Sequence, residues 1–541
     1  MRLVCLKKGF PRVGVYLNFV GTESGANLVA FTKLAVANQH PALQNKARCL
    51  QLPNVVLEIV HGNSLLLPRV RFMRLKPVTS VVAFALVLGS LAFTPMVSPA
   101  AASPLQAVPA TRQVTPAWVN SATVYEVNVR QFSPAGNFAG VTAALPRIKA
   151  LGTNVIWLMP IYPVGKINAK GSLGSPYSVA NYTAVNPDFG TDQDFKNLVD
   201  TAHSMGMKVV LDWVANHTAW DNPWITQHPD WYTQDANGKI IWPAGTDWND
   251  VADLNYDNQG LRSAMTDAMK YWVSKFDIDG YRCDAAGMVP TDFWEQATSS
   301  VNQIKQLWWL AEDQSTDALL YRAFSANYNW NLLDGLNHVG GKDAISYAIS
   351  GSVTNYPSGT FPMNFITNHD ENSWNGTEFQ RLGNAVKVSA AITFITPGIP
   401  LIYDGQEIGM NHQLQFFEKD PIVWGSNPAA SPWTAFFSKL TKLRANNSAL
   451  WSGATGGSLN FITNSNAKLL EVWRGKGTNR VLFLANLGAQ PIKTKLSISA
   501  GIAGKYVTYS TGKAVTFKKG ARVAVSIPAW DFVIYSTAAA K

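Results

Sequence analysis

Cysteine is scarce in this sequence of 541 residues, which contains three of them, Cys5, Cys49 and Cys283. Neither a CxxC pair nor an HExxH motif occurs, so the spacings that usually hold zinc are absent. Charged residues are also few, at 15%, whereas hydrophobic residues make up 47%. This balance excludes an intrinsically disordered chain and predicts a large packed core.

Residues 73–102 differ from the rest of the chain. They begin with two basic side chains, continue with an apolar run and end with three alanines: Arg74 and Lys76, Val81–Phe93, and Ala100–Ala102. This is the pattern of a secretory signal peptide, and the apolar run is too short to cross a bilayer comfortably. A short membrane anchor is the alternative. We therefore expect a secreted protein, extracellular or periplasmic, with no stable membrane insertion after cleavage.

A signal peptide belongs at the beginning of a chain, yet residues 1–72 precede this one. The simplest interpretation is that residues 1–72 are a mis-assigned upstream extension and that translation begins at Met73. A genuine N-terminal extension is the alternative. Residues 103–116 are rich in Pro, Ala and Thr and are expected to form a linker.

Nearly all of the net charge of +10 belongs to the leader. Residues 1–102 contain eleven Lys and Arg and two Asp and Glu, which leaves 34 basic and 33 acidic residues, or +1, in the remainder. The sequence therefore gives no support for a nucleic-acid partner. Cleavage after Ala102 would also leave Cys283 as the one cysteine, so the core must provide the stability without an internal disulfide.

Residues 117–450 alternate between short apolar runs and segments of helical period. Such alternation predicts an α/β fold, a (β/α)8 TIM barrel, in which buried parallel strands read as continuous apolar runs. Residues 218–258 have no sustained period and are expected to form an inserted, irregular domain B. From 451 to 541 short strands between Gly and Asn turns predict a C-terminal antiparallel β-sandwich. The barrel strands are expected at 123–129, 155–159, 208–213, 279–284, 308–312, 365–370 and 399–403.

Acidic residues stand at the carboxyl ends of four of these strands, where barrel active sites assemble. They are Asp212, Asp284, Glu312 and Asp370. Arg282 shares a strand face with Asp284, because the two are two residues apart, and we expect it to lower the pKa of Asp284 and keep it ionised. A purely structural Arg–Asp pair is the alternative. Glu312 follows two tryptophans and a leucine, an apolar setting that should raise its pKa and suit it to donate a proton.

Four segments in this order resemble the conserved regions of the α-amylase family, glycoside hydrolase family 13. They are DWVANHT (212–218), GYRCD (280–284), LAED (310–313) and TNHDEN (367–372). PGIPLIYDGQEIG (397–409) resembles the last barrel strand of that family. The resemblance implies hydrolysis of α-glucosidic bonds, most simply α-1,4, in starch-like glucans or maltooligosaccharides, with retention through a covalent intermediate. It implies no organic cofactor.

The resemblance also implies a role for each matching residue. Asp284 would be the nucleophile, Glu312 the general acid/base and Asp370 the transition-state stabiliser. Arg282 would orient Asp284, and Asp212 would be a structural acid of the barrel. The remaining positions would bind substrate: His217 and His369 through sugar hydroxyls, and Tyr177 by stacking.

The sequence also departs from the family. Many members have Lys-His shortly after the nucleophile, where this chain has Ala285-Ala286-Gly287-Met288. The change removes a contact on the leaving-group side and, in calcium-binding members, a backbone ligand. Asn216 and Asp253 still match positions of calcium ligands, so calcium is the one cofactor left open. A glucanotransferase or isomerase is the alternative function, whereas a catalytically silent binding protein is disfavoured because the acidic triad is complete.

Overall fold

The structure is a computed structural model that describes residues 114–338 and 341–537, together with four short strands near the N-terminus. The chain divides into two compact units, Met1–Ser103 and Pro104–Lys541. In the first unit β1 (Tyr16–Phe19) pairs with β2 (Ala30–Lys33), and β3 (Leu50–Leu52) pairs with β4 (Val55–Leu57), both antiparallel. The predicted signal peptide, residues 73–102, lies outside the described residues.

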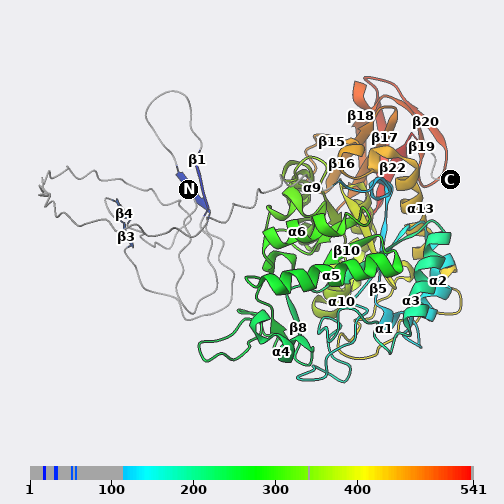
Figure 1. Cartoon of the computed structure of the whole chain (residues 1–541). Coiled ribbons are helices and arrows are strands. Elements are labelled where there is room, and N and C mark those ends of the chain that lie inside the picture. The colour runs from blue at the N-terminus through cyan, green and yellow to red at the C-terminus, as the bar shows by residue number, and fades with distance from the viewer. Residues whose placement is uncertain are drawn as a thin grey trace, which may run out of the picture. The chain divides into compact units, whose positions relative to one another are not determined.

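Eight parallel strands of the second unit form a closed barrel, which confirms the predicted fold class. Helices surround it (Figure 1). Within a strand alternate side chains face opposite sides, so Trp157 belongs to the core inside the barrel and Ile156 to the layer under the helices. Burial on both faces explains the continuous apolar runs. The strands are β5 (Val124–Val127), β6 (Val155–Leu158), β7 (Lys208–Trp213), β10 (Gly280–Cys283), β11 (Trp308–Ala311), β12 (Ala326–Tyr328), β13 (Phe361–Asn364) and β14 (Ile399–Tyr403).

The helices begin and end at local capping signals. Asn137 accepts a hydrogen bond from the backbone of Gly140 at the start of α2, and Gly152 ends that helix in the left-handed region at φ 97°. Thr191 and Asp194 form a capping box on α3. The main outer helices are α2 (Phe138–Leu151), α3 (Asp192–Ser204), α5 (Gln259–Phe276), α6 (Thr291–Val301), α8 (Trp330–Asn337), α9 (Lys342–Thr354), α12 (Val386–Ile395) and α13 (Pro432–Asn446).

The strand predicted at 365–370 is wrong. Strand β13 ends at Asn364, and His369 begins helix α10 (His369–Asn375). The Asn368 side chain caps this helix by accepting from the backbone N–H of Glu371, and acidic residues fill its first turn. The apolar residues 365 and 366 follow the pattern of a buried strand, which explains the wrong prediction. The polar residues after them form the start of a helix.

Two further parts complete the unit. Residues 218–258 contain little regular structure beyond α4 (Trp224–Gln227) and the pairing of β8 (His217–Ala219) with β9 (Val251–Asp253). After residue 457 a six-stranded antiparallel sheet packs through an apolar core against a two-stranded sheet. Their strands are β15 (Ser458–Phe461), β16 (Leu469–Lys476), β17 (Asn479–Asn486), β18 (Ile492–Ser497), β19 (Gly504–Thr508), β20 (Ala514–Phe517), β21 (Arg522–Ile527) and β22 (Phe532–Ser536). No helix among the described residues is long and apolar enough to span a membrane.

Candidate active site

The register of three adjacent strands places the predicted acids side by side. On β10, Arg282 lies opposite Asp212 of β7 on one side and Leu310 of β11 on the other. The ladder continues one residue beyond the strands, because the N–H of Asp284 donates to Trp213 O at 2.9 Å and the N–H of Glu312 donates to Cys283 O at 2.9 Å. Asp284 and Glu312 are therefore neighbours at the carboxyl end of the barrel.

Arg282 is the centre of this group and is fully buried. Its Nη1 lies 2.8 Å from Asp212 Oδ1 and 3.0 Å from Asp284 Oδ1, and its Nη2 lies 2.9 Å from Glu312 Oε1. Its Nε donates to the Tyr328 hydroxyl at 3.0 Å. One guanidinium thus faces three carboxyl groups, whereas the sequence had indicated its pairing with Asp284 alone.

The pKa values of the two central carboxyl groups are separated. Burial raises the pKa of Asp284 to about 6, although Arg282 acts against this. The expectation that Arg282 would bring this pKa below its ordinary value is wrong, because the cost of desolvation exceeds the effect of the cation. Burial raises the pKa of Glu312 to about 8, and the neighbouring Asp284 adds to the rise, as expected for a proton donor. Near neutral pH, Asp284 is ionised and Glu312 is protonated.

The residue after Asp284 has an unusual backbone. Ala285 has φ 42° and ψ 39°, in the left-handed region that non-glycine residues rarely adopt. In this conformation its N–H donates to Glu312 Oε2 at 2.8 Å. A strained backbone at this point therefore holds one carboxyl oxygen of Glu312 while Arg282 holds the other.

Asp370 lies in the first turn of α10 and reaches the same region. Burial acts to raise its pKa, but the charge of His369, whose Nε2 lies 3.2 Å from Asp370 Oδ2, brings the pKa below its ordinary value. Burial likewise acts against the charge of His369, but Asp370 and Glu126 raise its pKa, and Glu126 forms an ion pair with its Nδ1. Asp370 is thus an anion whose partner is a cationic histidine.

Tyr177 links Asp212 to His369. Its hydroxyl donates to Asp212 Oδ2 at 3.0 Å and lies 2.8 Å from His369 Nε2. Its ring runs nearly parallel to that of Phe416, at 12°, with ring centroids 6.1 Å apart. The tyrosine and the histidine predicted to bind sugar are therefore brought together with the acids, and both ring nitrogens of His369 already have protein partners.

His217 lies at the start of β8 and is buried. Burial lowers its pKa to about 4, so its ring is neutral near neutral pH. Its Nδ1 lies 3.2 Å from the Asn216 amide, and its ring packs against Trp248 of the inserted segment at 5.5 Å between centroids. The insertion thus supports one of the predicted sugar-binding residues.

Sequence reasoning missed three side chains in this region. Glu126 is the one charged residue of β5, and Tyr328 ends the short strand β12. Trp374 lies one helical turn after Asp370 on α10 and forms a hydrogen bond with it. Trp374 is 54% exposed and packs against Phe416 with ring centroids 5.1 Å apart. If residues 369–375 are read as a helix, the spacing of four residues between Asp370 and Trp374 places the two side chains next to each other.

Of the predicted calcium ligands, Asn216 directly precedes β8 and Asp253 ends β9. The N–H of Leu254 donates to Asn216 O at 3.1 Å, and Asp253 pairs with His217 across the two strands. Among the residues that the structure describes, no three His, Cys, Asp or Glu side chains form a group that could hold a metal ion. Asn216 and Asp253 alone would supply two of the about six to eight oxygen ligands that a calcium ion takes. Calcium therefore has no part in the chemistry derived below.

Comparisons with known proteins agree with this geometry. A family model described as "Alpha amylase, catalytic domain" matches residues 111–457. "Alpha-amylase 3" of Dictyoglomus thermophilum is 28% identical over 399 residues, which are 66% of this chain and 77% of that protein. A "4-alpha-glucanotransferase" of Thermotoga neapolitana is 26% identical over 351 residues, 56% of this chain and 76% of that one. The crystal structure of an alpha-amylase from Lactobacillus plantarum matches with TM-score 0.68 and 32% identity, covering 77% of this chain and 99% of that chain.

Proposed function

Because the chain belongs to the α-amylase family, we propose that it hydrolyses α-glucosidic bonds, chiefly α-1,4, in starch-like glucans or maltooligosaccharides with retention of configuration. The observation that carries the proposal is the group around Arg282. Two carboxyl groups from adjacent strands contact one guanidinium and have pKa values of about 6 and about 8. A retaining glycosidase needs this pair: one ionised group that attacks and one protonated group that donates.

In the first step the Asp284 carboxylate attacks the anomeric carbon and forms a glycosyl ester. The bond to the leaving oxygen breaks at the same time, and Glu312 gives that oxygen its proton. In the second step the Glu312 carboxylate takes a proton from water, and the water oxygen displaces Asp284 from the same face on which the leaving group stood. Two displacements return the α configuration, and Glu312 is protonated again for the next turnover.

The surrounding residues are assigned supporting roles in this proposal. Asp370, kept ionised beside His369, would stabilise the positive charge that develops on the sugar. Arg282 would orient both catalytic carboxyl groups, and Asp212 would hold Arg282 in place. The side chains proposed to contact the sugar are His217, His369 and Tyr177.

Substitution of the nucleophile tests the assignment. Asp284→Asn should reduce kcat by several powers of ten, because no other group is placed to form the glycosyl ester. Circular dichroism and thermal unfolding would show whether the fold is intact. A folded variant that keeps more than about a hundredth of wild-type kcat would contradict the role of Asp284.

Glucanotransferase activity is the second candidate, because one of the similar proteins is named a 4-alpha-glucanotransferase. The glycosyl ester on Asp284 could react with a sugar hydroxyl instead of water. A time course of products from starch, maltoheptaose, pullulan and trehalose separates the two. Short products that accumulate from starch or maltoheptaose support hydrolysis. Products longer than maltoheptaose would instead show that the protein is a glucanotransferase.

We also propose that the protein is secreted, on the basis of residues 73–102, which have the composition of a signal peptide. N-terminal sequencing of the protein from the culture medium or the periplasm tests this. A mature chain that begins at Ser103 is expected. A protein that is found only inside the cell and still carries residues 73–102 would contradict the proposal.

A further inference from the structure

The catalytic barrel and the C-terminal domain have opposite net charges. Residues 103–450 contain 22 basic and 31 acidic side chains, a net charge of −9, whereas residues 451–541 contain 12 basic and 2 acidic ones, a net charge of +10. The total of +1 for the two parts together conceals this separation. Glu471 is buried, and Asp531 pairs with Lys387. The C-terminal domain therefore has no acidic side chain left to balance its exposed lysines.

Several of these cations lie on the two-stranded sheet. Across the β18–β21 ladder Lys493 faces Ser526, Lys495 faces Ala524, and Arg522 faces Ser497. The alternate residues of both strands point into the apolar core, so these six point outward. The turn before β21 carries Lys518 and Lys519 and lies beside the end of β18, because the N–H of Gly520 donates to Ile498 O at 2.9 Å. We call Lys493, Lys495, Lys518, Lys519 and Arg522 the basic face, and all five are exposed.

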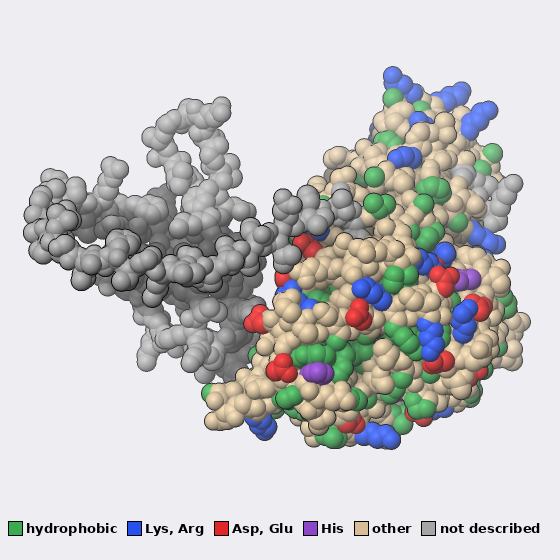
Figure 2. All heavy atoms as spheres, viewed as in Figure 1, with side chains coloured by type: hydrophobic (Ala, Val, Ile, Leu, Met, Phe, Trp, Pro, Cys, Tyr) green, Lys and Arg blue, Asp and Glu red, His purple; other side chains and the backbone are tan. Residues whose placement is uncertain are grey.

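The charged side chains of the basic face are all positive. Figure 2 shows blue side chains, and no red ones, at the top of the molecule, where the C-terminal domain lies. Within the described ranges none of its five side chains forms an ion pair or a hydrogen bond. Lysines on edge strands prevent aggregation, which would account for Lys493 and Lys495. That explanation does not account for Lys518 and Lys519 in the turn. It also does not explain why the face has no acidic side chains, since the surfaces of soluble proteins usually mix positive and negative charges.

The chemistry of the face excludes several ligands. An α-glucan is neutral, so it gains nothing from five cations. No aromatic side chain stands on the face for a sugar or a nucleobase to stack on. The side chains between the cations are Ser497, Ala524 and Ser526, which leave the surface flat and offer nothing to insert into a bilayer.

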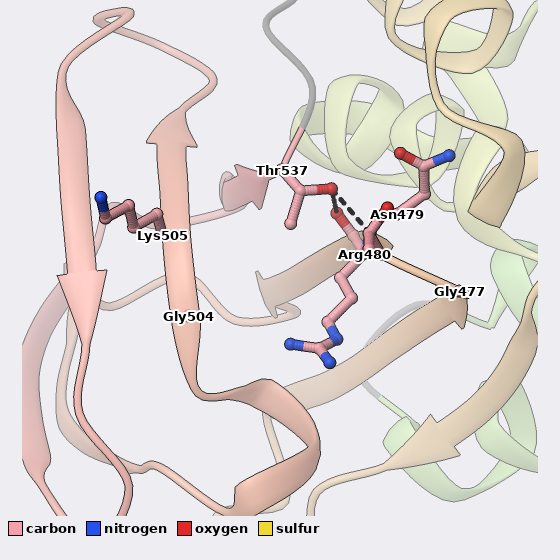
Figure 3. A pocket seen from close by; sticks show the side chains of 7 residues that line it. Gly477, Asn479, Arg480, Gly504, Lys505 and Thr537 are labelled. Carbon is pink, nitrogen blue, oxygen red and sulfur yellow. Dashed lines mark hydrogen bonds between the residues drawn. The ribbon is translucent and has the colours of Figure 1, made fainter.

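The cations of this domain are arranged for an extended ligand. Lys493 and Lys495 are two residues apart on one strand, so their backbones are about 7 Å apart along it. A pocket elsewhere in the domain, about 340 Å³, includes Arg480 and Lys505 in its lining. Figure 3 shows these two side chains pointing in different directions, and Arg480 Nη1 already donates to Ala503 O at 2.8 Å. The pocket therefore does not bring its cations together on one compact anion, whereas the basic face presents a row of free ones.

We propose that the basic face binds linear inorganic polyphosphate, a phosphate chain without sugars or bases, and so holds the enzyme on a polyanionic support. The acidic barrel is repelled by the same polymer, which keeps the glucan-cleaving end away from it. Five cations that each displace condensed counterions predict a log–log salt slope of about −3.5, or about a hundredfold weaker binding between about 50 and about 200 mM salt.

Long-chain inorganic polyphosphate is the probe, and binding to the whole protein is measured by biolayer interferometry at several salt concentrations. The test variant is Lys493→Gln/Lys495→Gln/Lys518→Gln. The control carries the same change of charge on exposed lysines of the barrel part that form no ion pair among the described residues, Lys149→Gln/Lys439→Gln/Lys442→Gln. The test variant should bind at least about tenfold more weakly, with a salt slope reduced by about two, while the control keeps wild-type binding. Both should cleave maltoheptaose at the wild-type rate.

Three outcomes would overturn the proposal. The wild type could fail to bind polyphosphate at low salt, or the control variant could lose as much binding as the test variant. Tighter binding to single-stranded DNA or to anionic vesicles than to polyphosphate would show a different ligand. Hydrolysis of maltoheptaose is measured separately, so failure here is distinguishable from failure of the proposed function.

Discussion

The pH dependence of hydrolysis follows from the two carboxyl groups that Arg282 holds. Asp284 must be ionised to attack, and burial raises its pKa to about 6. Glu312 must be protonated to donate, and burial raises its pKa to about 8. Activity should therefore fall as the pH drops below the first value and as it rises above the second. A plot of kcat/KM against pH is expected to be a bell between the two.

The size of the effect follows from the same values. At about pH 7, about nine-tenths of each group is in the required protonation state. At about pH 5 or about pH 9, one of the two is competent in only about a tenth of the molecules, so kcat/KM should fall about ninefold in either direction. Because Asp284 and Glu312 interact, the two limbs of the pH profile report the pair of groups together. A variant is needed to assign each limb to one residue.

The assay is the initial rate on maltoheptaose between about pH 4 and about pH 10 at constant ionic strength. Glu312→Gln should be measured on α-maltosyl fluoride, whose fluoride leaves without a proton. Because kcat/KM reports the first step, this variant should keep the acidic limb and lose the alkaline one. If both wild-type limbs lay below about pH 5, or if Glu312→Gln kept its alkaline limb, the reasoning from burial would be refuted.

Three further predictions concern the surroundings of the site. Glu126→Gln removes the carboxylate that pairs with His369, so the pKa of His369 should fall and Asp370 should lose part of the positive charge beside it. We therefore expect kcat to drop about tenfold, and an unchanged kcat would contradict this connection between Glu126 and Asp370. Trp374→Ala should raise KM for maltoheptaose about fivefold while Trp374→Phe, which keeps an aromatic face, does not; equal KM values for both would show that the exposed ring does not contact substrate. Dialysis against EDTA should leave the melting temperature and kcat/KM unchanged, since no three His, Cys, Asp or Glu side chains gather into a metal-binding group among the described residues; a melting temperature lower by about 5 °C would reveal a calcium site.

Much of the barrel could be predicted from the sequence, because a strand buried on both faces reads as an apolar run. The acids at the carboxyl ends of β7, β10 and β11 are predictable in this way, and parallel pairing brings them together. Asp370 was assigned to the right site for the wrong reason, since it lies on a helix rather than at the end of a strand. The helix start at Asn368 was hidden by the apolar pair before it.

Other features of the site depend on tertiary structure. Glu126 meets His369 across 243 positions of sequence, and only closure of the barrel brings β5 near α10. The left-handed backbone of Ala285 could not be predicted, because alanine has no intrinsic preference for that region. The pKa of Asp284 depends on how deeply its strand is buried, which an adjacent arginine in the sequence does not reveal.

The central claim is that Asp284 forms a covalent bond to the sugar. An α-maltosyl fluoride with a second fluorine on C5 of the reacting ring forms the intermediate and slows its hydrolysis, so the adduct can be trapped. Mass spectrometry of the digested protein is then predicted to find one fluorinated maltosyl group on the peptide that contains Asp284. An adduct on another carboxylate, such as Glu312 or Asp370, or a rapidly reacting enzyme that never carries the label, would contradict the account.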